Sequence, residues 1–374
     1  MPELRPTAAR APATALDAAR GVDAVLDDVL DARLRQAHQV DPVFAQDVAG
    51  RVAGLIRRGG KRLRTAFVWC GWRAAGGTGD ATAVLRTGAA LELLQACALI
   101  HDDLMDGSPL RRGGPTVHVE LARLHTAARM TGSKDAFGAS ATVLAGDLAL
   151  AWADDLLTET ALRLPHGPRL YEEWRAMRGE MVAGQYRDLH AQATGASGVE
   201  EALTVATLKS ALYTVERPLA LGAALAGADV RTVDALRRAG RDAGLAFQLR
   251  DDLLGAFGDP ALTGKPADDD LRARKLTYLL AVAVRLAAAS GDEEVVAALA
   301  ADPSPRPDAA VERMRKALEW TGARALTETK IAELAAASLR HFEGTGADTA
   351  VREEFAALVA RVSGGVPQRT EDTA

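Results

Sequence analysis

The stretch DATAVLRTGAALELLQACALIHDDLMD (residues 80–106) decides the fold class of this chain. Its apolar residues recur at helical spacing and only Gly88 interrupts them, so it predicts one long helix that is buried on several sides. Segments with similar spacing fill the chain from about residue 16 to about residue 362, separated by short Gly, Pro or Asp breaks. This periodicity predicts an all-α protein, a bundle of long, mostly antiparallel helices, roughly a dozen in number.

The composition agrees with a helical protein and excludes one class of partner. Apolar residues make up 48% of the chain and aromatic residues only 4%, with Ala and Leu dominant, which favours helices over a sheet. The formal net charge of −5 leaves no basic footprint, so we expect no nucleic-acid partner.

No low-complexity linker or fixed repeat marks a domain boundary in the 374 residues. We therefore expect one helical domain at 15–363, a flexible N-terminal extension at 1–14 and a flexible C-terminal tail at 364–374. No uninterrupted apolar run approaches the roughly 20 residues of a membrane-spanning helix, so we expect no membrane span. The two cysteines, Cys70 and Cys97, form neither a disulfide framework nor a zinc motif, and we expect a cytoplasmic protein.

An acidic cluster, LIHDDLMD (residues 99–106), ends the long helix. Asp102 and Asp106 lie four residues apart and point from one helix face, with Asp103 beside them. Like charges at a helix C-terminus are destabilising unless cations neutralise them, and Mg²⁺ shared with substrate phosphates suits such an open cluster. The alternative is a solvated acidic helix end.

The loop GSPLRRGGPT (residues 107–116) places Arg111 and Arg112 directly after the acidic cluster. Because a guanidinium presents a planar fork of donors that suits phosphate oxygens, the combination indicates a metal and phosphate site. A simple surface ion pair is the alternative.

Two further segments carry charge at helix ends. The run GGKRLR (residues 59–64) leads from a glycine turn into a helix, where cations and the helix N-terminus together favour a phosphate. The run FQLRDD (residues 247–252) brings a second acidic pair, followed by GKP at 264–266. That Lys does not belong to a P-loop, because Pro266 replaces the Ser or Thr that binds Mg²⁺.

Taken together, these motifs, in this order and with KSA at 209–211, resemble the trans-isoprenyl diphosphate synthases of the polyprenyl synthetase family, most of all geranylgeranyl diphosphate synthases. The resemblance covers about residues 59 to 277 and implies helices around a deep catalytic cavity, usually in a homodimer. It implies a magnesium-dependent prenyltransferase that joins isopentenyl diphosphate head-to-tail to an allylic diphosphate. The substrates would be the partners, with up to three Mg²⁺ ions per active site.

The resemblance also implies roles for residues that match the family motifs. The metal ligands would be Asp102, Asp103, Asp106, Asp251 and Asp252. The isopentenyl diphosphate site would contain Lys61, Arg64, Gln95 and Arg112. The allylic diphosphate would contact Arg111, Lys209, Ser210, Gln248, Lys265 and Lys275, of which Lys209, Gln248 and Lys265 would also be catalytic. The chain departs from the pattern at Gly255, where the second acidic motif usually has a third Asp, and before Lys275, where a Gly is missing.

The length of the product would be set behind the first acidic motif. Family members that stop at fifteen carbons often carry a bulky aromatic residue at the positions of Cys97 and Ala98, and both residues are small here. Leu94 lies about one further helical turn, or about 5.4 Å, behind them and would form the next floor. A twenty-carbon product, geranylgeranyl diphosphate, is therefore expected.

Two other functions are compatible with part of this pattern. A class I terpene cyclase also uses an Asp-rich metal site, but it has no second diphosphate for the Lys61 and Arg64 cations to bind. A catalytically weak modulatory subunit of a prenyl synthase usually loses Asp motifs, and both acidic pairs are present here.

Overall fold

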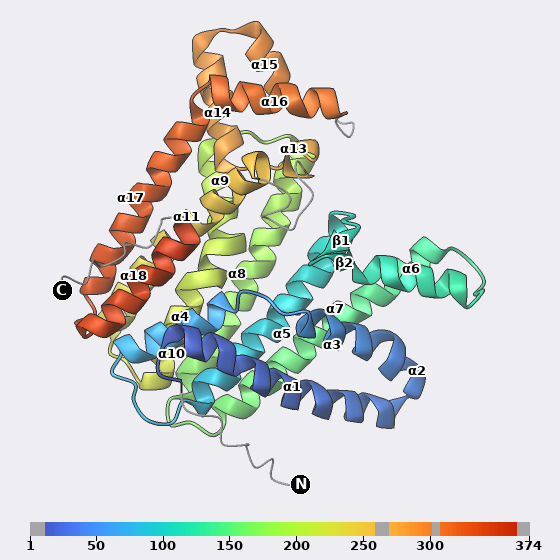
Figure 1. The fold of residues 1–374 in the computed structure, drawn as a ribbon, viewed down its shortest axis with the longest axis vertical. Coiled ribbons are helices and arrows are strands. Elements are labelled where there is room, and N and C mark those ends of the chain that lie inside the picture. The colour runs from blue at the N-terminus through green and yellow to red at the C-terminus, as the bar shows by residue number, and fades with distance from the viewer. Residues whose placement is uncertain (1–11, 259–268, 301–306, 365–374) are drawn as a thin grey trace, which may run out of the picture. The chain divides into compact units, whose positions relative to one another are not determined.

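The computed structural model describes residues 12–258, 269–300 and 307–364. Within them the protein is helical, and the prediction of an all-α fold is confirmed (Figure 1). The contacts fall into two compact units: 12–72, 77–171 and 224–226 make the first, and 73–76, 172–223, 227–258, 269–300 and 307–364 make the second. The predicted tail from residue 365 and the extension before residue 12 lie outside the described residues.

The first unit contains the predicted central helix. Its elements are α1 (Ala15–Val40), α2 (Pro42–Phe44), the π-helix η1 (Ala45–Ala49), α3 (Gly50–Arg57), most of α4 (Leu63–Ala74), α5 (Thr82–Met105), β1 (Leu110–Arg111), β2 (Gly114–Pro115), α6 (Val117–Ala127) and α7 (Lys134–Ala161). The stretch quoted above forms α5, which packs lengthwise against α7 and also contacts α1 (Figure 1).

Local chemistry fixes where these helices begin and how closely they pack. Thr14 and Asp17 form a capping box, in which the Thr14 hydroxyl accepts from the Asp17 amide at 3.1 Å, so α1 begins at Ala15. Between α5 and α7 a glycine makes the contact: a Cβ on Gly146 would lie 2.0 Å from Nε2 of His101. Gly146 therefore provides the space in which the His101 ring lies against α7.

The second unit surrounds α11, the helix of the second acidic pair. It holds most of α8 (Gly167–Thr194), α9 (Val199–Ala206), the π-helix η2 (Thr207–Glu216), most of α10 (Arg217–Ala226), α11 (Val230–Phe257), α13 (Asp269–Arg272), α14 (Tyr278–Ser290), α15 (Glu293–Leu299), α16 (Asp308–Trp320), α17 (Ala323–Glu343) and α18 (Thr349–Ser363). Helix α11 packs against η2, α17 and α18 (Figure 1).

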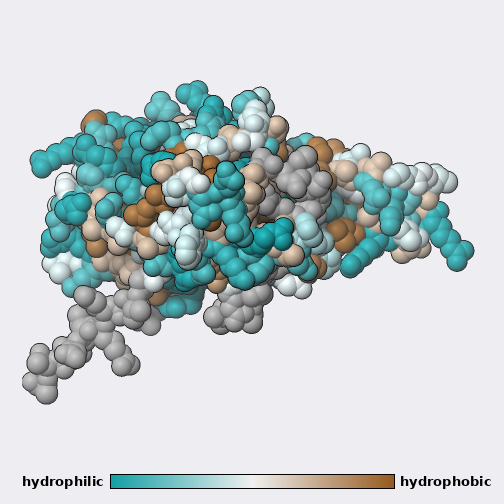
Figure 2. All heavy atoms as spheres, turned by 90° about the horizontal axis from the view of Figure 1, so that it is seen from above, coloured by the Kyte–Doolittle hydropathy of each residue, from teal (hydrophilic) through white to brown (hydrophobic). Residues whose placement is uncertain are grey.

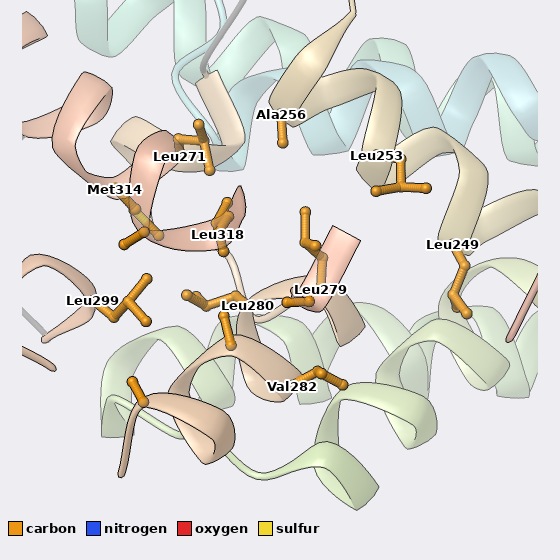
Figure 3. Packing of buried hydrophobic residues seen from close by; sticks show 14 of the residues in the cluster. Leu249, Leu253, Ala256, Leu271, Leu279, Leu280, Val282, Leu299, Met314 and Leu318 are labelled. Atoms are coloured by element: carbon orange, nitrogen blue, oxygen red, sulfur yellow. The ribbon is translucent and has the colours of Figure 1, made fainter. Parts of the chain in front are cut away.

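An apolar cluster fixes the rotation of α11. Leu249 and Leu253, four residues apart, belong to one buried cluster with Leu279 and Leu280 of α14, and Met314 and Leu318 of α16 lie on its far side (Figure 3). Burying each such leucine stabilises the fold by about 1.5–3 kcal/mol. Because these positions are committed to the core, Asp251 between them lies at the edge of the cluster and remains only half-buried.

Two helices carry unusually apolar surfaces. Helices α5 and α7 are long and apolar enough to cross a membrane, a property that core helices of soluble proteins share. Of their most apolar windows, 67% is buried inside the protein for α5 and 39% for α7. Elsewhere, Figure 2 shows a face on which hydrophilic residues predominate and hydrophobic residues gather in small patches.

We predict that Gly184→Ala destabilises the second unit by about 1–3 kcal/mol, because overpacking a close contact costs that much. A Cβ on Gly184 of α8 would lie 2.3 Å from the backbone nitrogen of Lys209 in η2, so the two helices would have to move apart. The matched control is Gly179→Ala on the same helix, where a Cβ meets nothing within 4 Å. Urea unfolding should show a loss for Gly184→Ala and a gain of about 0.5–1 kcal/mol for the control. Equal effects would contradict the close contact.

Candidate active site

Three carboxylates crowd the C-terminal end of α5. Asp102 and Asp106 are half-buried, whereas the side chain of Asp103 is only 3% exposed. No basic residue lies in the last turn of this helix, and a helix C-terminus repels negative charge. This end of α5 is therefore a place where positive charge from another source is strongly favoured.

A short hairpin supplies one such charge. Strands β1 and β2 pair antiparallel, with Arg111 opposite Gly114, so Arg112 and Gly113 form a two-residue turn. Both turn residues have positive φ, 52° for Arg112 and 74° for Gly113, as a type I′ turn requires. This turn allows the two neighbouring arginines to make different contacts.

Arg111 is paired with the acidic end of α5. Its Nε donates to Oδ1 of Asp103 at 2.8 Å, and Nη2 donates to the same oxygen and lies 3.8 Å from Oδ2 of Asp102. Burial raises the pKa of Asp103, and the bonds from Arg111 offset only part of that rise. Burial alone lowers the pKa of Arg111, but the bonds and charge of Asp103 outweigh this effect and raise it. Arg111 is therefore a fixed positive charge beside Asp102.

Arg112 lies beside the GGKRLR run instead. Its Nη1 donates to the carbonyl oxygen of Leu55 at 3.2 Å, and a Cβ on Gly60 would lie 3.0 Å from Nη2. Burial lowers the pKa of Arg112, Glu92 raises it, and the guanidiniums of Arg62, Arg111 and Arg58 lower it further. A bound anion would relieve this crowding of positive charge.

The other residues of the predicted isopentenyl diphosphate site lie on α4, the turn before it, and α5. Lys61 is exposed and Arg64 is half-buried. Oε1 of Gln95 is buried and makes no hydrogen bond to any residue that the structure describes. A buried amide oxygen without a hydrogen bond from the protein is a candidate contact for a polar ligand.

The three predicted chain-length residues differ in their surroundings. Leu94 is fully buried and Cys97 nearly so, whereas Ala98 is half-buried. The Cys97 thiol lies 3.8 Å from Nδ1 of His101, and burial, followed by the charges of Asp147 and Asp154, raises its pKa to about 12. Cys97 therefore remains a neutral thiol on the α7 side of α5.

In the second unit, Gln248 and Asp252 are one helical turn apart on α11. Nε2 of Gln248 donates to Oδ1 of Asp252 at 2.7 Å. Burial raises the pKa of Asp252 to about 8, and the neighbouring charges of Asp251, Asp270 and Asp188 contribute to the rise. Such a group favours either a proton or a metal cation at neutral pH.

Lys209 is positioned by a residue that the sequence analysis did not single out. Nζ of Lys209, on η2, lies 2.6 Å from Oδ2 of the buried Asp188 on α8. Ser210 follows Lys209 and is half-buried. The run GQYRDL at 184–189 carries no signal for this pairing, because the burial of Asp188 is visible only in the structure. The π-helical form of η2 likewise had no signal in the sequence.

The loop region after α11 is partly described. Lys275 lies 3.7 Å from Oδ1 of Asp270, and a Cβ on Gly255 would lie 2.7 Å from Oδ2 of the same residue. Asp270 was also missed by the sequence analysis, and it brings a carboxylate next to the position where the family's third Asp is absent. The predicted residue Lys265 lies outside the described residues.

The donor sets suit Mg²⁺ shared with a ligand better than a closed metal cage. In the described ranges, no group of three or more carboxylate, His or Cys side chains already converges on one point. Each acidic helix end nevertheless offers oxygen ligands only, with Asp102 and Asp106 in the first unit and Asp251 and Asp252 in the second. Oxygen ligands completed by water and phosphate are what Mg²⁺ prefers.

The chain belongs to the Polyprenyl synthetase family, whose sequence model matches residues 46–318. Like the other members of that family, it is a prenyltransferase that makes trans-prenyl diphosphates.

Named relatives show what the chain is similar to. It is 35% identical over 70% of its length to a geranylgeranyl diphosphate synthase from Mycobacterium tuberculosis, covering 69% of that protein. It is 32% identical over 67% of its length to a geranylfarnesyl diphosphate synthase from Aeropyrum pernix, covering 73% of that protein. A crystal structure of a geranylgeranyl pyrophosphate synthase from Corynebacterium glutamicum matches with a TM-score of 0.86 and 38% identity, covering 92% of this chain and 98% of that one.

We predict that Asp252→Asn makes the metal-free protein increasingly more stable than the parent as the pH rises. The folded pKa of about 8 lies above the unfolded value of about 3.9, so the proton on Asp252 stabilises the fold at low pH. That contribution is lost between about pH 4 and pH 8, whereas Asn stays neutral throughout. Urea unfolding in EDTA at several pH values measures the difference. Asp234→Asn, an exposed position on the same helix, is the control, and a pH-independent difference for Asp252→Asn would contradict the prediction.

Proposed function

We propose that this protein is a magnesium-dependent geranylgeranyl diphosphate synthase, which condenses isopentenyl diphosphate with allylic diphosphates. The observation that carries the proposal is the arrangement in the first unit. There, one hairpin turn places Arg111 on the acidic end of α5 and Arg112 beside the basic turn before α4. A prenyl synthase needs both an acidic metal site and a separate cationic site for a second diphosphate.

The cationic group of the first unit is proposed to bind isopentenyl diphosphate. Lys61, Arg64 and Arg112 supply charge, and the buried amide of Gln95 supplies a polar contact. The lowered pKa of Arg112 supports this role: burial lowers it most and the neighbouring guanidiniums add to the effect, and a bound anion would offset both. Charge-assisted bonds from guanidinium groups fix both the position and the orientation of a diphosphate.

Magnesium is proposed to be held by Asp102 and Asp106 in the first unit and by Asp251 and Asp252 in the second, with up to three ions in all. Asp103 is proposed to support Asp102 through their common partner Arg111. When bound, Mg²⁺ neutralises the charge that develops on the departing diphosphate. The Corynebacterium glutamicum structure contains magnesium and isoprenyl diphosphate, and a polyprenyl synthase from Caulobacter crescentus was crystallised with calcium and isoprenyl diphosphate.

The reaction requires charge stabilisation more than proton transfer. Breaking the allylic carbon–oxygen bond leaves an allyl cation, while the electron pair departs with the diphosphate. Lys209, held by Asp188, and Arg111 are proposed to stabilise the negative charge on that leaving group. Lys265 and Lys275 are proposed as further contacts of the allylic diphosphate.

The amide of Gln248 is proposed to stabilise the cation. Its NH₂ group donates to Asp252, so the carbonyl oxygen is turned away from that carboxyl and faces the opposite direction. The double bond of isopentenyl diphosphate then attacks the cation to form the new carbon–carbon bond. A proton leaves the adjacent carbon, and the released diphosphate accepts it, so no separate base is required.

Geranylgeranyl diphosphate is the proposed product because the tunnel side of α5 offers little bulk at the first position behind Asp102. Ala98 is small and half-buried, and fully buried Leu94 lies one turn farther back. The similar proteins carry three product names, because farnesyl diphosphate synthases of Mycobacterium bovis and M. tuberculosis are 34% identical to this chain, alongside the geranylgeranyl and geranylfarnesyl enzymes.

A homodimer in the cytoplasm is also proposed. Val143 and Leu144 on α7 are 45% and 60% exposed, next to each other on the least buried of the apolar helices. A second copy that packs against α7 would remove this apolar surface from water. The cytoplasm is proposed because Cys70 and Cys97 are both free thiols.

We predict metal-dependent condensation that Asp102→Asn lowers by about 100-fold or more, because stabilisation of the leaving group is lost. Purified protein is incubated with Mg²⁺, labelled isopentenyl diphosphate and, separately, dimethylallyl, geranyl or farnesyl diphosphate, and the dephosphorylated products are chromatographed. Geranylgeraniol is expected from each starter. Asp155→Asn, an exposed residue of α7, is the matched control and should retain activity.

Three other outcomes of this assay would each contradict a different part of the proposed function. Farnesol as the final product would overturn the assignment of Leu94 as the floor while sparing the reaction class. Turnover of a single allylic diphosphate without isopentenyl diphosphate would indicate a terpene cyclase. No turnover with any starter would indicate a modulatory subunit.

We predict that Leu144→Glu converts the dimer to a monomer, because a charge in an apolar interface is costly to bury. Size-exclusion chromatography with light scattering measures the mass. The control is Leu162→Glu, which adds the same charge at an apolar residue just beyond α7 that is 83% exposed. A Leu144→Glu protein that is dimeric, or a parent protein that is already monomeric, would refute the proposed interface.

A further inference from the structure

Arg62 differs from the other cations of the GGKRLR run because it points into the protein. Its side chain is only 7% exposed, whereas the neighbouring Lys61 is exposed. Each nitrogen of its guanidinium has a partner. Nε donates to Oδ1 of Asp23 at 2.9 Å, Nη1 to Oε2 of Glu92 at 2.6 Å, and Nη2 to the carbonyl oxygen of Ile56 at 3.1 Å.

We call Arg62, Glu92, Asp23 and the Ile56 carbonyl the Arg62 clasp. Its partners come from three helices, α1, α5 and the C-terminal end of α3. The backbone of Arg62 has φ = 48°, a left-handed conformation that costs a residue with a side chain of order 1 kcal/mol or more. The three hydrogen bonds hold this backbone conformation. Between Lys61 and Leu63 in the chain, the side chain of Arg62 therefore points into the protein.

Glu92 connects the clasp to the rest of the predicted isopentenyl diphosphate site. It is buried on α5, three residues before Gln95. Its charge acts on Arg62 and also raises the pKa of Arg112, against the effect of burial. Glu92 therefore acts both on Arg62, together with Asp23, and on the guanidinium of Arg112 that is assigned to the substrate.

We propose that Arg62 and Glu92 are positioning residues for isopentenyl diphosphate, an inference that rests on the proposed function. Arg62 does not touch the substrate. It fixes the turn that carries Lys61 and leads into α4, the helix of Arg64, and Glu92 compensates the charge of Arg112 while no anion is bound. The clasp thereby sets the affinity for the homoallylic substrate, independently of the allylic one.

The geometry requires an arginine rather than a generic cation. The three acceptors lie on different elements and engage all three nitrogens of one planar guanidinium. A lysine ammonium is a single point donor and spans fewer of them, so the turn loses at least one of its three attachments. A lysine at position 62 keeps the positive charge opposite Glu92. The substitution therefore tests the position of the turn separately from the charge balance.

Arg62→Lys tests this inference through the two Michaelis constants. We expect the KM for isopentenyl diphosphate to rise about tenfold and the KM for the allylic diphosphate to change by less than about twofold, because misplaced contacts act on one substrate only. The matched control is Arg57→Lys, whose guanidinium bonds Asp27 and Asp31 of α1 at the surface of the same helix pair. It should leave both constants within about twofold of the parent.

Two further variants keep the test decisive. Glu92→Gln removes the shared counter-charge and should also raise the KM for isopentenyl diphosphate alone. Asp23→Asn alters the most exposed member of the clasp, at 56%, and should fold even if the buried variants do not. Assays are run below the thermal unfolding midpoint of each variant.

The outcomes separate the inference from the proposed function. Suppose that the parent condenses the two substrates but that the folded clasp variants have an unchanged KM for isopentenyl diphosphate. That result would overturn the inference and leave the function standing. An equal rise in both Michaelis constants would assign the clasp to general stability and would also overturn it. A parent protein that does not condense the two substrates would overturn the proposed function itself.

Discussion

Negative charge at the carboxyl end of α5 is the constraint around which the first unit is organised. Asp102, Asp103 and Asp106 lie where the helix dipole repels anions. The hairpin that follows returns Arg111 to this end, where its guanidinium bonds Asp103 and lies 3.8 Å from a carboxylate oxygen of Asp102. The cost of this arrangement is offset by packing elsewhere on the helix, where buried residues of α5 lie against α7 and α1.

The second unit meets a related constraint by burial. Asp252 and Asp188 are both buried; Asp252 accepts from the amide of Gln248, whereas Asp188 lies beside the ammonium of Lys209 and also accepts from Gln192. A neutral amide offsets the burial of a carboxylate less than an ammonium does, which is why Asp252 has the strongly raised pKa. At each acidic site, then, a cation of the chain holds a buried carboxylate: Arg111 holds Asp103 and Lys209 holds Asp188.

Features determined by local periodicity were predictable from the sequence. The long helix at 80–106 appears as α5, and the positions of Asp102 and Asp106 on one face follow from four-residue spacing. The side of α11 that faces the core follows from Leu249 and Leu253 in the same way. Such patterns depend on neighbours within one helical turn.

Features that depend on distant partners were not predictable. Nothing within the GGKRLR run distinguishes Arg62, which turns inward, from Lys61, which does not, because Asp23 and Glu92 lie 39 and 30 residues away. The pairing of Asp188 with Lys209 spans 21 residues and depends on Gly184 letting two helices meet. The division of the described contacts into two units likewise has no marker in the composition.

The covering of α11 by the last two helices determines when the second unit is completed during synthesis. Arg250 on α11 donates to the carbonyl oxygen of Ser363 at the end of α18, 113 residues later, and the Ser338 hydroxyl of α17 donates to the carbonyl oxygen of Ala239, 99 residues away. When α11 has just emerged from the ribosome, α17 and α18 have not yet been made. The face of α11 that they cover therefore has no partner at that stage. Its apolar surface stays open until α17 and α18 have emerged, so this unit is completed late and exposes apolar surface until then.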